Sequence, residues 1–292
     1  MKNIIYILPF LLLCSACGDD FFSTTLEIDP PEHTEQMVVH AVFSDIDSIM
    51  ALSLGITAGL LEEIDFTSEG LVDSATVELY RNGTLLSNFT PLEEDFEPLN
   101  YGVIREERLG STEATFELTV KHPDYPDLRA VQQMPRAVVP TEVRYRENAG
   151  LFEGDRLNGV EITINDPAGE VNFYELLLYN ISNNSSFPIS TYSNSPVAEE
   201  NAEGLGFVIS DETFDGKEFK ITLLSYSQLD STTHLVINNI TEDLFKYSKS
   251  VSDQRESDGF GLFAEPVTIS TNVENGLGIF GLRASRFYPL EF

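Results

Sequence analysis

Three glycines near the C-terminus have the spacing of a dinucleotide-binding loop. Gly276, Gly278 and Gly281 form a G-x-G-x-x-G motif in the stretch NGLGIFGLRAS. In nucleotide-binding proteins these glycines let the backbone approach a pyrophosphate, and an acidic residue about 20 positions later binds the ribose. Only 11 residues follow Gly281, and they include Pro289. A βαβ unit does not fit there, so we expect no nucleotide cofactor and a structural reason for the glycines.

The histidines show no metal-binding spacing. None of the four has another histidine three or four residues away, and Cys14 and Cys17 both lie near the N-terminus; the histidines are His33, His40, His122 and His234. A zinc site is therefore unsupported. His234 lies among apolar residues, and we interpret it as a strand residue rather than a catalytic base.

The acidic residues are too many to single out a catalytic pair. Asp253, Glu256 and Asp258 could bind calcium, but a solvated run of charge is the better interpretation. No G-x-S-x-G elbow and no S-x-x-K motif supplies a nucleophile. We expect neither a metal nor a cofactor, and we expect a protein that is not an enzyme.

The charge balance limits the partners of the chain. Its 292 residues include 17 Lys and Arg against 48 Asp and Glu, a formal net charge of −31. Such a chain repels nucleic acid and anionic lipid headgroups. The hydrophobic fraction of 42% is too high for an acidic disordered chain, so a folded protein with an acidic surface is expected.

The N-terminus has the features of a secretory signal. Lys2 precedes an apolar stretch at 4–13, which is too short to span a bilayer. The sequence Cys14-Ser15-Ala16-Cys17 resembles the lipobox of bacterial lipoproteins, whose signal is cleaved before an acylated cysteine. We expect a signal peptide at 1–16 and lipidation at Cys17; an ordinary signal peptide cleaved nearby is the alternative.

The residues after the lipobox predict a tether. Positions 17–35 are polar and acidic and contain Pro30-Pro31. Asp19 and Asp20 resemble the acidic export signal of Bacteroidetes surface lipoproteins. We therefore expect a chain anchored by lipid in the outer membrane and exposed at the cell surface.

Short strand-like segments dominate the rest of the chain. In TFELTV (115–120) apolar and polar residues alternate, and Asn82-Gly83 is typical of a hairpin turn. The spacing of such segments predicts an immunoglobulin-like β-sandwich over 36–136. Pro135 and Pro140 mark a boundary, and a second β-rich domain is expected over 140–292.

One segment of the second domain has helical periodicity. Thr241 is a candidate N-cap, acidic residues follow it, and Leu244, Tyr247 and Val251 share one face. We predict a helix near 241–256 that packs on the second sheet. The Ser- and Asn-rich stretch 182–196 is expected to be a loop, and the tyrosines that flank it, Tyr179 and Tyr192, are candidate ligand contacts.

Four sequence pieces of the second half occur together in one known family. They are INDP with NFY (164–174), FDGKEF (214–219), YSKSVSDQ (247–254) and FAEPVTISTNVENGLGIFG (263–281). Behind a lipobox and a sheet-rich first domain, they resemble the Bacteroidetes outer-membrane lipoproteins of the domain of unknown function 4249 family. The signature residues are Asn165, Asp166, Pro167, Phe214, Asp215, Gly216, Pro266, Asn272, Gly276, Gly278, Phe280 and Gly281. In the last piece we predict a strand at 267–273, a turn at Asn275-Gly276 and a returning strand at 277–284.

The resemblance implies a function but no chemistry. Members of that family are typically encoded beside TonB-dependent transporters, so an accessory or substrate-capture protein for such a β-barrel is the leading hypothesis. A surface hydrolase of glycans or peptides, and a structural or adhesive surface module, are the alternatives. The ligand is not specified by the sequence.

The anchor gives a first testable prediction. Mass spectrometry of the chain purified from membranes is expected to find Cys17 as the first residue, carrying acyl chains, because each buried methylene adds about 0.8 kcal/mol to membrane binding. An unmodified, freely secreted polypeptide would contradict this.

Overall fold

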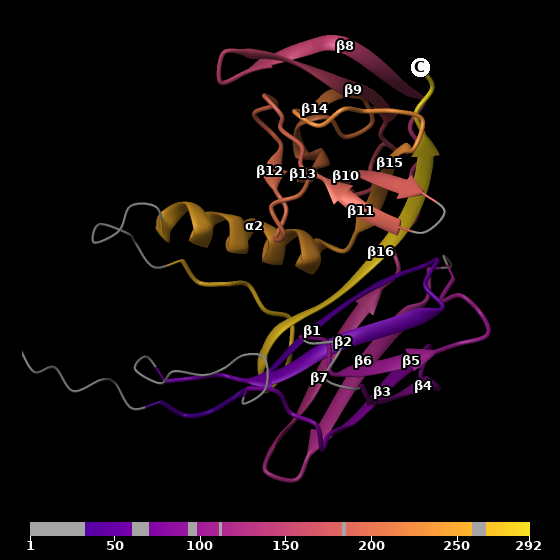
Figure 1. Cartoon of the computed structure of the whole chain (residues 1–292). Coiled ribbons are helices and arrows are strands. Elements are labelled where there is room, and N and C mark those ends of the chain that lie inside the picture. The colour runs from indigo at the N-terminus through magenta and orange to yellow at the C-terminus, as the bar shows by residue number, and fades with distance from the viewer. Residues whose placement is uncertain (1–32, 60–69, 93–97, 111–112, 183–184, 259–266) are drawn as a thin grey trace, which may run out of the picture. The chain divides into compact units, whose positions relative to one another are not determined.

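The described part of the chain is mainly β-structure, as the sequence predicts (Figure 1). The computed structural model describes residues 33–59, 70–92, 98–110, 113–182, 185–258 and 267–292. Within these residues there is one α-helix, α2 (Glu242–Asp258), and one 3-10 helix, η3 (Asp211–Thr213). The strands are β1 (Met37–Ser44), β2 (Ile49–Ile56), β3 (Thr76–Arg81), β4 (Thr84–Pro91), β5 (Tyr101–Ile104), β6 (Thr115–His122), β7 (Tyr125–Gln133), β8 (Glu142–Phe152), β9 (Asp155–Asn165), β10 (Phe173–Ser182), β11 (Ser185–Ile189), β12 (Glu199–Glu200), β13 (Phe207–Ser210), β14 (Glu218–Ser225), β15 (Thr233–Ile240) and β16 (Leu277–Pro289).

These strands form two sheets. The larger has thirteen strands in the order β12-β13-β10-β15-β16-β1-β2-β5-β4-β3-β6-β7, with β11 paired to β10. The smaller has three strands in the order β14-β9-β8. The described residues from Glu35 to Thr57 and from 70 to Phe292 belong to one compact unit.

Local sequence signals are confirmed in the first half. Asn82 and Gly83 both have positive φ, at 50° and 76°, and they turn β3 into β4, as a two-residue hairpin requires. Phe116, Leu118 and Val120 of β6 are all buried. The immunoglobulin-like arrangement of these strands stays a prediction.

Strand β16 joins the two halves of the chain. It pairs in parallel with β1, with Val38 opposite Leu277 and Ser44 opposite Arg283. On its other edge it pairs antiparallel with β15, with Ile240 opposite Arg283. The expected boundary at Pro135–Pro140 lies in the irregular stretch between β7 and β8. Sheet hydrogen bonds nevertheless run between the first strand and the last (Figure 1).

The predicted strand at 267–273 is wrong. This segment has no strand structure, and the partners of β16 are β1 and β15 instead. The physical reason is the Asn272 side chain, whose amide donates to the Phe280 carbonyl (2.8 Å) and accepts from the Phe280 N–H (2.9 Å). One side chain thus takes the place of a strand partner. The turn expected at Asn275 is present, with φ of 63°.

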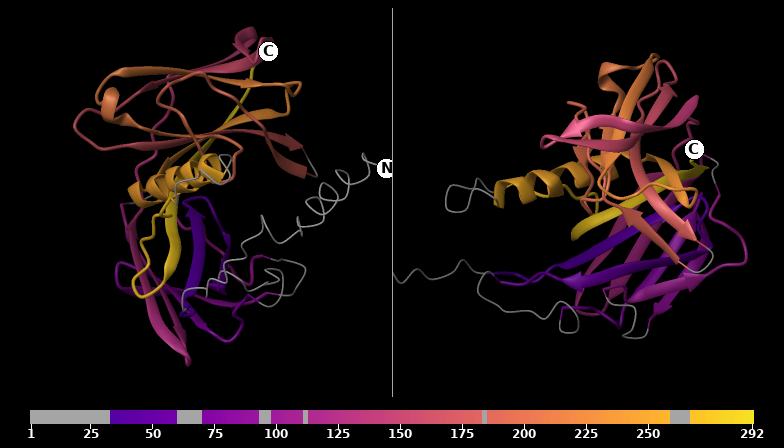
Figure 2. Two further views of the ribbon diagram at one scale, coloured as in Figure 1. Left: turned by 90° about the vertical axis from the view of Figure 1, so that its left-hand side faces the viewer. Right: turned by 45° about the horizontal axis from the view of Figure 1, so that its top comes forward.

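The predicted helix is confirmed as α2. It begins after Thr241, whose carbonyl accepts from the Phe245 N–H, while the Thr241 hydroxyl accepts from the Leu282 N–H of β16. The hydroxyl therefore binds the sheet rather than capping the helix. Leu244 is buried in a cluster with Ile279 of β16. Figure 2 shows α2 beside the last strand, as the predicted apolar face requires.

Two larger clusters form the rest of the core. One lies among β1–β7 and includes Phe43, Phe116 and Phe280. The other includes Ile162 of β9 and Tyr174 of β10, and so lies between the small sheet and the large one. Phe280 of β16 thus belongs to the first cluster, and Ile279 beside it packs against α2.

Gly278 is required by the close approach of β16 to β1. Its φ is +104°, and a Cβ there would lie 1.9 Å from the Val39 carbonyl oxygen. Gly281 faces α2, where a Cβ would meet the Leu244 side chain at 2.9 Å. These contacts give the glycine spacing a structural explanation.

Substitution of Gly278 is expected to destabilise the protein far more than substitution of another glycine with a similar positive φ. Gly278→Ala should lower the free energy of unfolding by about 3 kcal/mol or more, because the backbone of β1 must move. Gly154→Ala is the control: its φ is +94°, but a Cβ there meets no atom within 4 Å, so a loss of about 1 kcal/mol is expected. Urea denaturation measures both, and equal losses would contradict the role of the close approach.

Candidate ligand-binding groove

The structure brings two of the signature pieces together. The Asp166 carboxylate accepts hydrogen bonds from the Tyr174 hydroxyl (2.5 Å) and the Gly216 N–H (3.0 Å). The Asp215 carboxylate accepts from the Gly169 N–H at 2.7 Å. The end of β9 is thereby fastened to the turn that precedes β14. Cys17, Asp19, Asp20 and Pro266 lie outside the described residues.

The remaining signature residues of these pieces surround this junction. The Phe214 ring stacks on Phe219 at 4.1 Å and lies 6.3 Å from Tyr174. Asn165 is exposed at the end of β9, and Pro167 is half-buried after it. These positions serve packing and turn geometry.

Three carboxylates at this junction have the chemistry of a cation site. Ligand oxygens of Asp166, Asp211 and Asp215 lie within 4.8 Å of one another. Asp211 accepts from the Asn172 N–H at 2.6 Å, and all three carboxylates are thus hydrogen-bonded within the chain. Burial raises the pKa of Asp211, with a smaller contribution from neighbouring Asp166. Burial and the bond to Asp166 also raise the pKa of Tyr174.

The histidines and Asp253 lie apart from this cluster of three aspartates. Within the described ranges, no other set of three His, Cys, Asp or Glu side chains is close enough to hold an ion. His234 lies in β15, as expected, and its Nδ1 lies 2.9 Å from the Thr232 carbonyl. Burial lowers the pKa of His40, whose ring is 5.8 Å from Tyr247. Asp253 lies 3.5 Å from Lys249 on α2.

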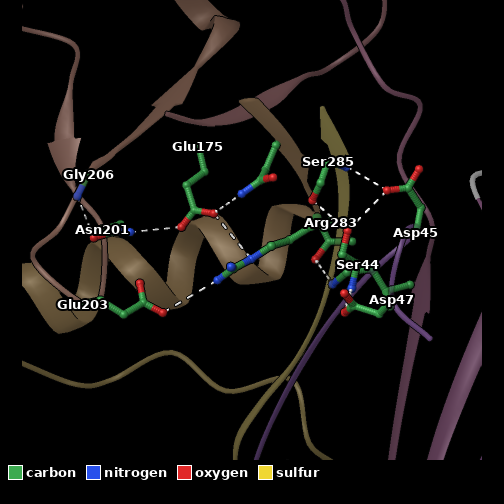
Figure 3. Close-up of polar contacts among 12 residues, drawn as sticks. Ser44, Asp45, Asp47, Glu175, Asn201, Glu203, Gly206, Arg283 and Ser285 are labelled. Atoms are coloured by element: carbon green, nitrogen blue, oxygen red, sulfur yellow. Dashed lines mark hydrogen bonds and ion pairs between the residues drawn. The ribbon is translucent and has the colours of Figure 1, made fainter. Parts of the chain in front are cut away.

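A buried ion pair lies where β10, β15 and β16 meet (Figure 3). Arg283 Nε is 3.4 Å from the Glu175 carboxylate, whose side chain is only 2% exposed. Asn201 and Asn238 donate to the two Glu175 oxygens at 3.1 and 2.7 Å. Glu203 approaches Arg283 from the neighbouring loop, at 3.7 Å. Burial alone would lower the pKa of Arg283, but the nearby carboxylates of Glu175 and Glu203 outweigh it and raise this pKa overall.

A second buried carboxylate fastens the β1–β2 turn to β16. Asp45 accepts from Arg286 Nη1 and from the Ser285 N–H, both at 2.8 Å. The Ser44 hydroxyl donates to Ser285 Oγ at 2.7 Å or to Asp45 at 3.3 Å (Figure 3). Because these groups pair with one another inside the protein, we assign them a structural role.

An open groove lies on the small sheet, on the face turned away from the core. Its volume is about 670 Å³, within the range of about 300–1,000 Å³ that is usual for ligand pockets. Ile162 and Ile221 belong to the core cluster, and Val143 packs against it. The residues that alternate with them along the strands line the groove: Glu142, Arg144, Glu161, Thr163, Lys220 and Thr222. Three rows cross the strands: Glu142, Thr163 and Lys220; Arg144, Glu161 and Thr222; Arg146, Gly159 and Leu224. Ser193–Pro196 borders the groove.

The charges of the groove are paired within it or beside it. Arg146 Nε lies 2.7 Å from Glu161, and Lys220 lies 3.0 Å from Glu218. Arg144 pairs with Glu142. The pairs Arg144–Glu142 and Lys220–Glu218 each lie along one strand, and Arg146–Glu161 joins β8 to β9, so that donors and acceptors lie side by side.

Three aromatic rings gather together, and two of them lie close in the chain to Ser193 and Leu224, which line the groove. Tyr192 is bonded through its backbone to Leu224 in both directions, at 2.8 and 2.7 Å. Its ring lies 4.3 Å from Phe152 and 5.4 Å from Tyr226, which is 51% exposed. We call Phe152, Tyr192 and Tyr226 the aromatic corner. Tyr179, the other predicted contact, lies in β10, where burial raises its pKa.

The expected loop at 182–196 contains the strand β11, so this part of the prediction is wrong. The cations of the groove are not among the residues predicted from the sequence, because single charges on a strand are typical of an ordinary protein surface. The signal was present in EVRYRE, where Glu142, Arg144 and Arg146 alternate with Val143 and Tyr145. Only the register with β9 and β14 shows that they share a face with Lys220.

Comparison with known families identifies the chain. A family described as "Domain of unknown function (DUF4249)" matches residues 23–286. The chain belongs to this family. The match spans both halves and every signature residue, and it confirms the resemblance drawn from the sequence. Searches of curated proteins and of solved structures gave no match. No helix in the described ranges is long and apolar enough to cross a membrane.

Asp211 gives a prediction with a defined pH dependence. Its pKa is higher in the folded state than in the unfolded chain, so its favourable contribution is complete below about pH 4 and is lost as the pH rises through the folded pKa. Asp211→Asn keeps an acceptor for Asn172 and removes the charge. The free energy of unfolding is expected to rise at pH 7, with a smaller difference near pH 4.

Asp230 is the control for this experiment. A hydrogen bond from the Thr232 side chain lowers the pKa of Asp230, so Asp230→Asn should change stability at pH 7 in the opposite direction. Denaturation in urea at several pH values measures both variants. A loss of stability in Asp211→Asn at every pH would show that its negative charge is needed.

Proposed function

We propose that this protein is a lipid-anchored, surface-exposed protein of the outer membrane that captures a ligand for a TonB-dependent transporter. The anchor would be the acylated Cys17, and the polar stretch at 17–35 would be the tether. The groove on the β14-β9-β8 sheet would be the capture site. The groove is the observation that supports this proposal best, because its volume and polar lining suit a ligand of several rings.

The arrangement of acids in the groove favours recognition over hydrolysis. A glycosidase needs two carboxyl groups free to exchange protons or attack the substrate, about 5–10 Å apart. The two carboxylates that line the groove, Glu142 and Glu161, are instead paired with Arg144 and Arg146. A carboxylate held beside a guanidinium in this way suits a hydrogen-bond acceptor for a ligand better than a nucleophile.

The transporter is proposed on the basis of the family resemblance. The family resemblance implies a neighbouring TonB-dependent β-barrel, and the family itself carries no assigned chemistry. The net charge of −31 also disfavours direct contact with nucleic acid or anionic lipid as the main task. A protein that binds a ligand close to a transporter agrees with these observations.

The proposal predicts a stable partner. Affinity purification of the tagged chain from detergent-solubilised outer membranes should recover a large β-barrel protein, identified by mass spectrometry. The Cys17→Ser variant, which lacks the anchor, serves as the control and should recover much less barrel. Repeated recovery of the wild-type chain alone would contradict the transporter role.

A further inference from the structure

We propose that the groove and the aromatic corner together bind a neutral oligosaccharide. This inference rests on the capture function proposed above and adds the chemical class of the ligand. It comes from three features of the site: paired charges along the strands, hydroxyl and amide groups beside them, and an exposed ring directly after β14.

The charges of the groove point to a ligand with many hydroxyl groups. A sugar hydroxyl both donates and accepts, so it is satisfied where a fixed donor and a fixed acceptor lie side by side. Arg146 with Glu161 and Arg144 with Glu142 provide two such sites on neighbouring rows. Because the ion pairs hold these side chains in place, less conformational entropy is lost on binding.

Smaller polar groups extend the same surface. Thr163 shares a row with Glu142 and Lys220, and Thr222 shares the next row with Arg144 and Glu161. Asn194 borders the groove and is fixed by a hydrogen bond to the Leu151 carbonyl at 2.7 Å. The polar lining therefore runs from the sheet onto the 193–196 segment.

The aromatic corner supplies an apolar face close to the end of β14. Lys220, Thr222 and Leu224 alternate along β14 and line the groove, and Tyr226 follows directly after the end of this strand. The Phe152 and Tyr192 rings support Tyr226 at 6.4 and 5.4 Å and leave it 51% exposed. An exposed tyrosine ring with fixed neighbours can stack against the C–H face of a sugar.

The length of this surface requires more than one sugar ring. Lys220 and Tyr226 are six positions apart, which corresponds to about 20 Å where the chain is extended, as it is in β14 up to Ser225. A single ring cannot contact the ion pairs and the aromatic corner at the same time. The ligand that uses the whole surface is an oligosaccharide.

Other ligand classes fit the site less well. An anion would compete with the carboxylate partner of each cation and would be repelled by a chain with net charge −31. A peptide strand would need an open sheet edge. On the edge strand β14, the backbone of Leu224 is already hydrogen-bonded to the backbone of Tyr192. On the other edge, the register of β8 shifts between Arg146 and Gly150, which interrupts the row of hydrogen bonds that a peptide would use.

The test uses the purified mature chain on an array of neutral oligosaccharides of glucose, mannose, galactose, xylose and fructose. Heparin is the anionic probe, and a casein digest is the peptide probe. Binding to at least one neutral oligosaccharide is expected, with no binding to heparin or peptides. Binding to heparin or peptides alone would overturn the ligand class, and so would an array with no bound member.

Matched variants locate the site. Tyr226→Ala and Arg146→Gln should each weaken binding at least tenfold. Phe187→Ala is the control for the tyrosine, because Phe187 is also 51% exposed but lies on β11. Arg129→Gln is the control for the arginine, because Arg129 pairs with Glu117 at 2.6 Å at a similar exposure. Both controls should bind like the wild type.

The outcomes separate this inference from the proposed function. Circular dichroism establishes that each variant is folded, and Thr222→Ala provides a smaller change if Arg146→Gln is not. Wild-type binding by folded Tyr226→Ala and Arg146→Gln variants would overturn the site. If the wild-type chain binds an oligosaccharide but recovers no β-barrel protein in the affinity purification, the transporter role is overturned and the ligand class is not.

Discussion

The structure depends on the position of β16 between β1 and β15. This strand is hydrogen-bonded along both edges, and both of its faces also meet packed layers. Phe280 and Leu282 enter the core of β1–β7, whereas Ile279 meets α2. Where the backbones come closest, a side chain cannot be accommodated, and Gly278 lies at that point. The constraint explains why apolar residues and glycines alternate so closely in this short segment.

The same strand brings charge into the interior. Arg283 follows the apolar part of β16 and meets Glu175, and Arg286 meets Asp45. A buried ion pair adds little net stability, because desolvation offsets most of the attraction, but removal of one partner costs about 3–5 kcal/mol. Such pairs are strongly selective for one register, since a shift of β16 by one residue would place Arg283 in the apolar core. They define the alignment of the first strand, the last strand and β10.

Much of the local structure follows from the sequence, and most of the long-range pairing does not. Alternation predicts β6, Asn82-Gly83 predicts the β3–β4 turn, and the apolar face at Leu244 predicts α2, because each depends on neighbouring residues. The parallel pairing of β16 with β1 joins residues more than 230 positions apart, and periodicity carries no information about such a partner. The segment 267–273 has a strand-like composition, but the Asn272 side chain provides the hydrogen bonds that a strand would have provided. The groove was missed for the same reason: Arg146 and Lys220 share a face only through β9.

The groove lies on the small sheet because the faces of the two sheets are covered to different extents. The large sheet is covered by α2 on one side of β16 and by apolar clusters on the other, so its central strands offer no open face. The small sheet packs one face against Tyr174 and its neighbours and leaves the other face open. On that face the acids that dominate the rest of the chain are balanced by Arg144, Arg146 and Lys220. Local neutrality within a strongly acidic protein disfavours ions as ligands, so the oligosaccharide that we propose would be recognised by hydrogen bonding and ring stacking.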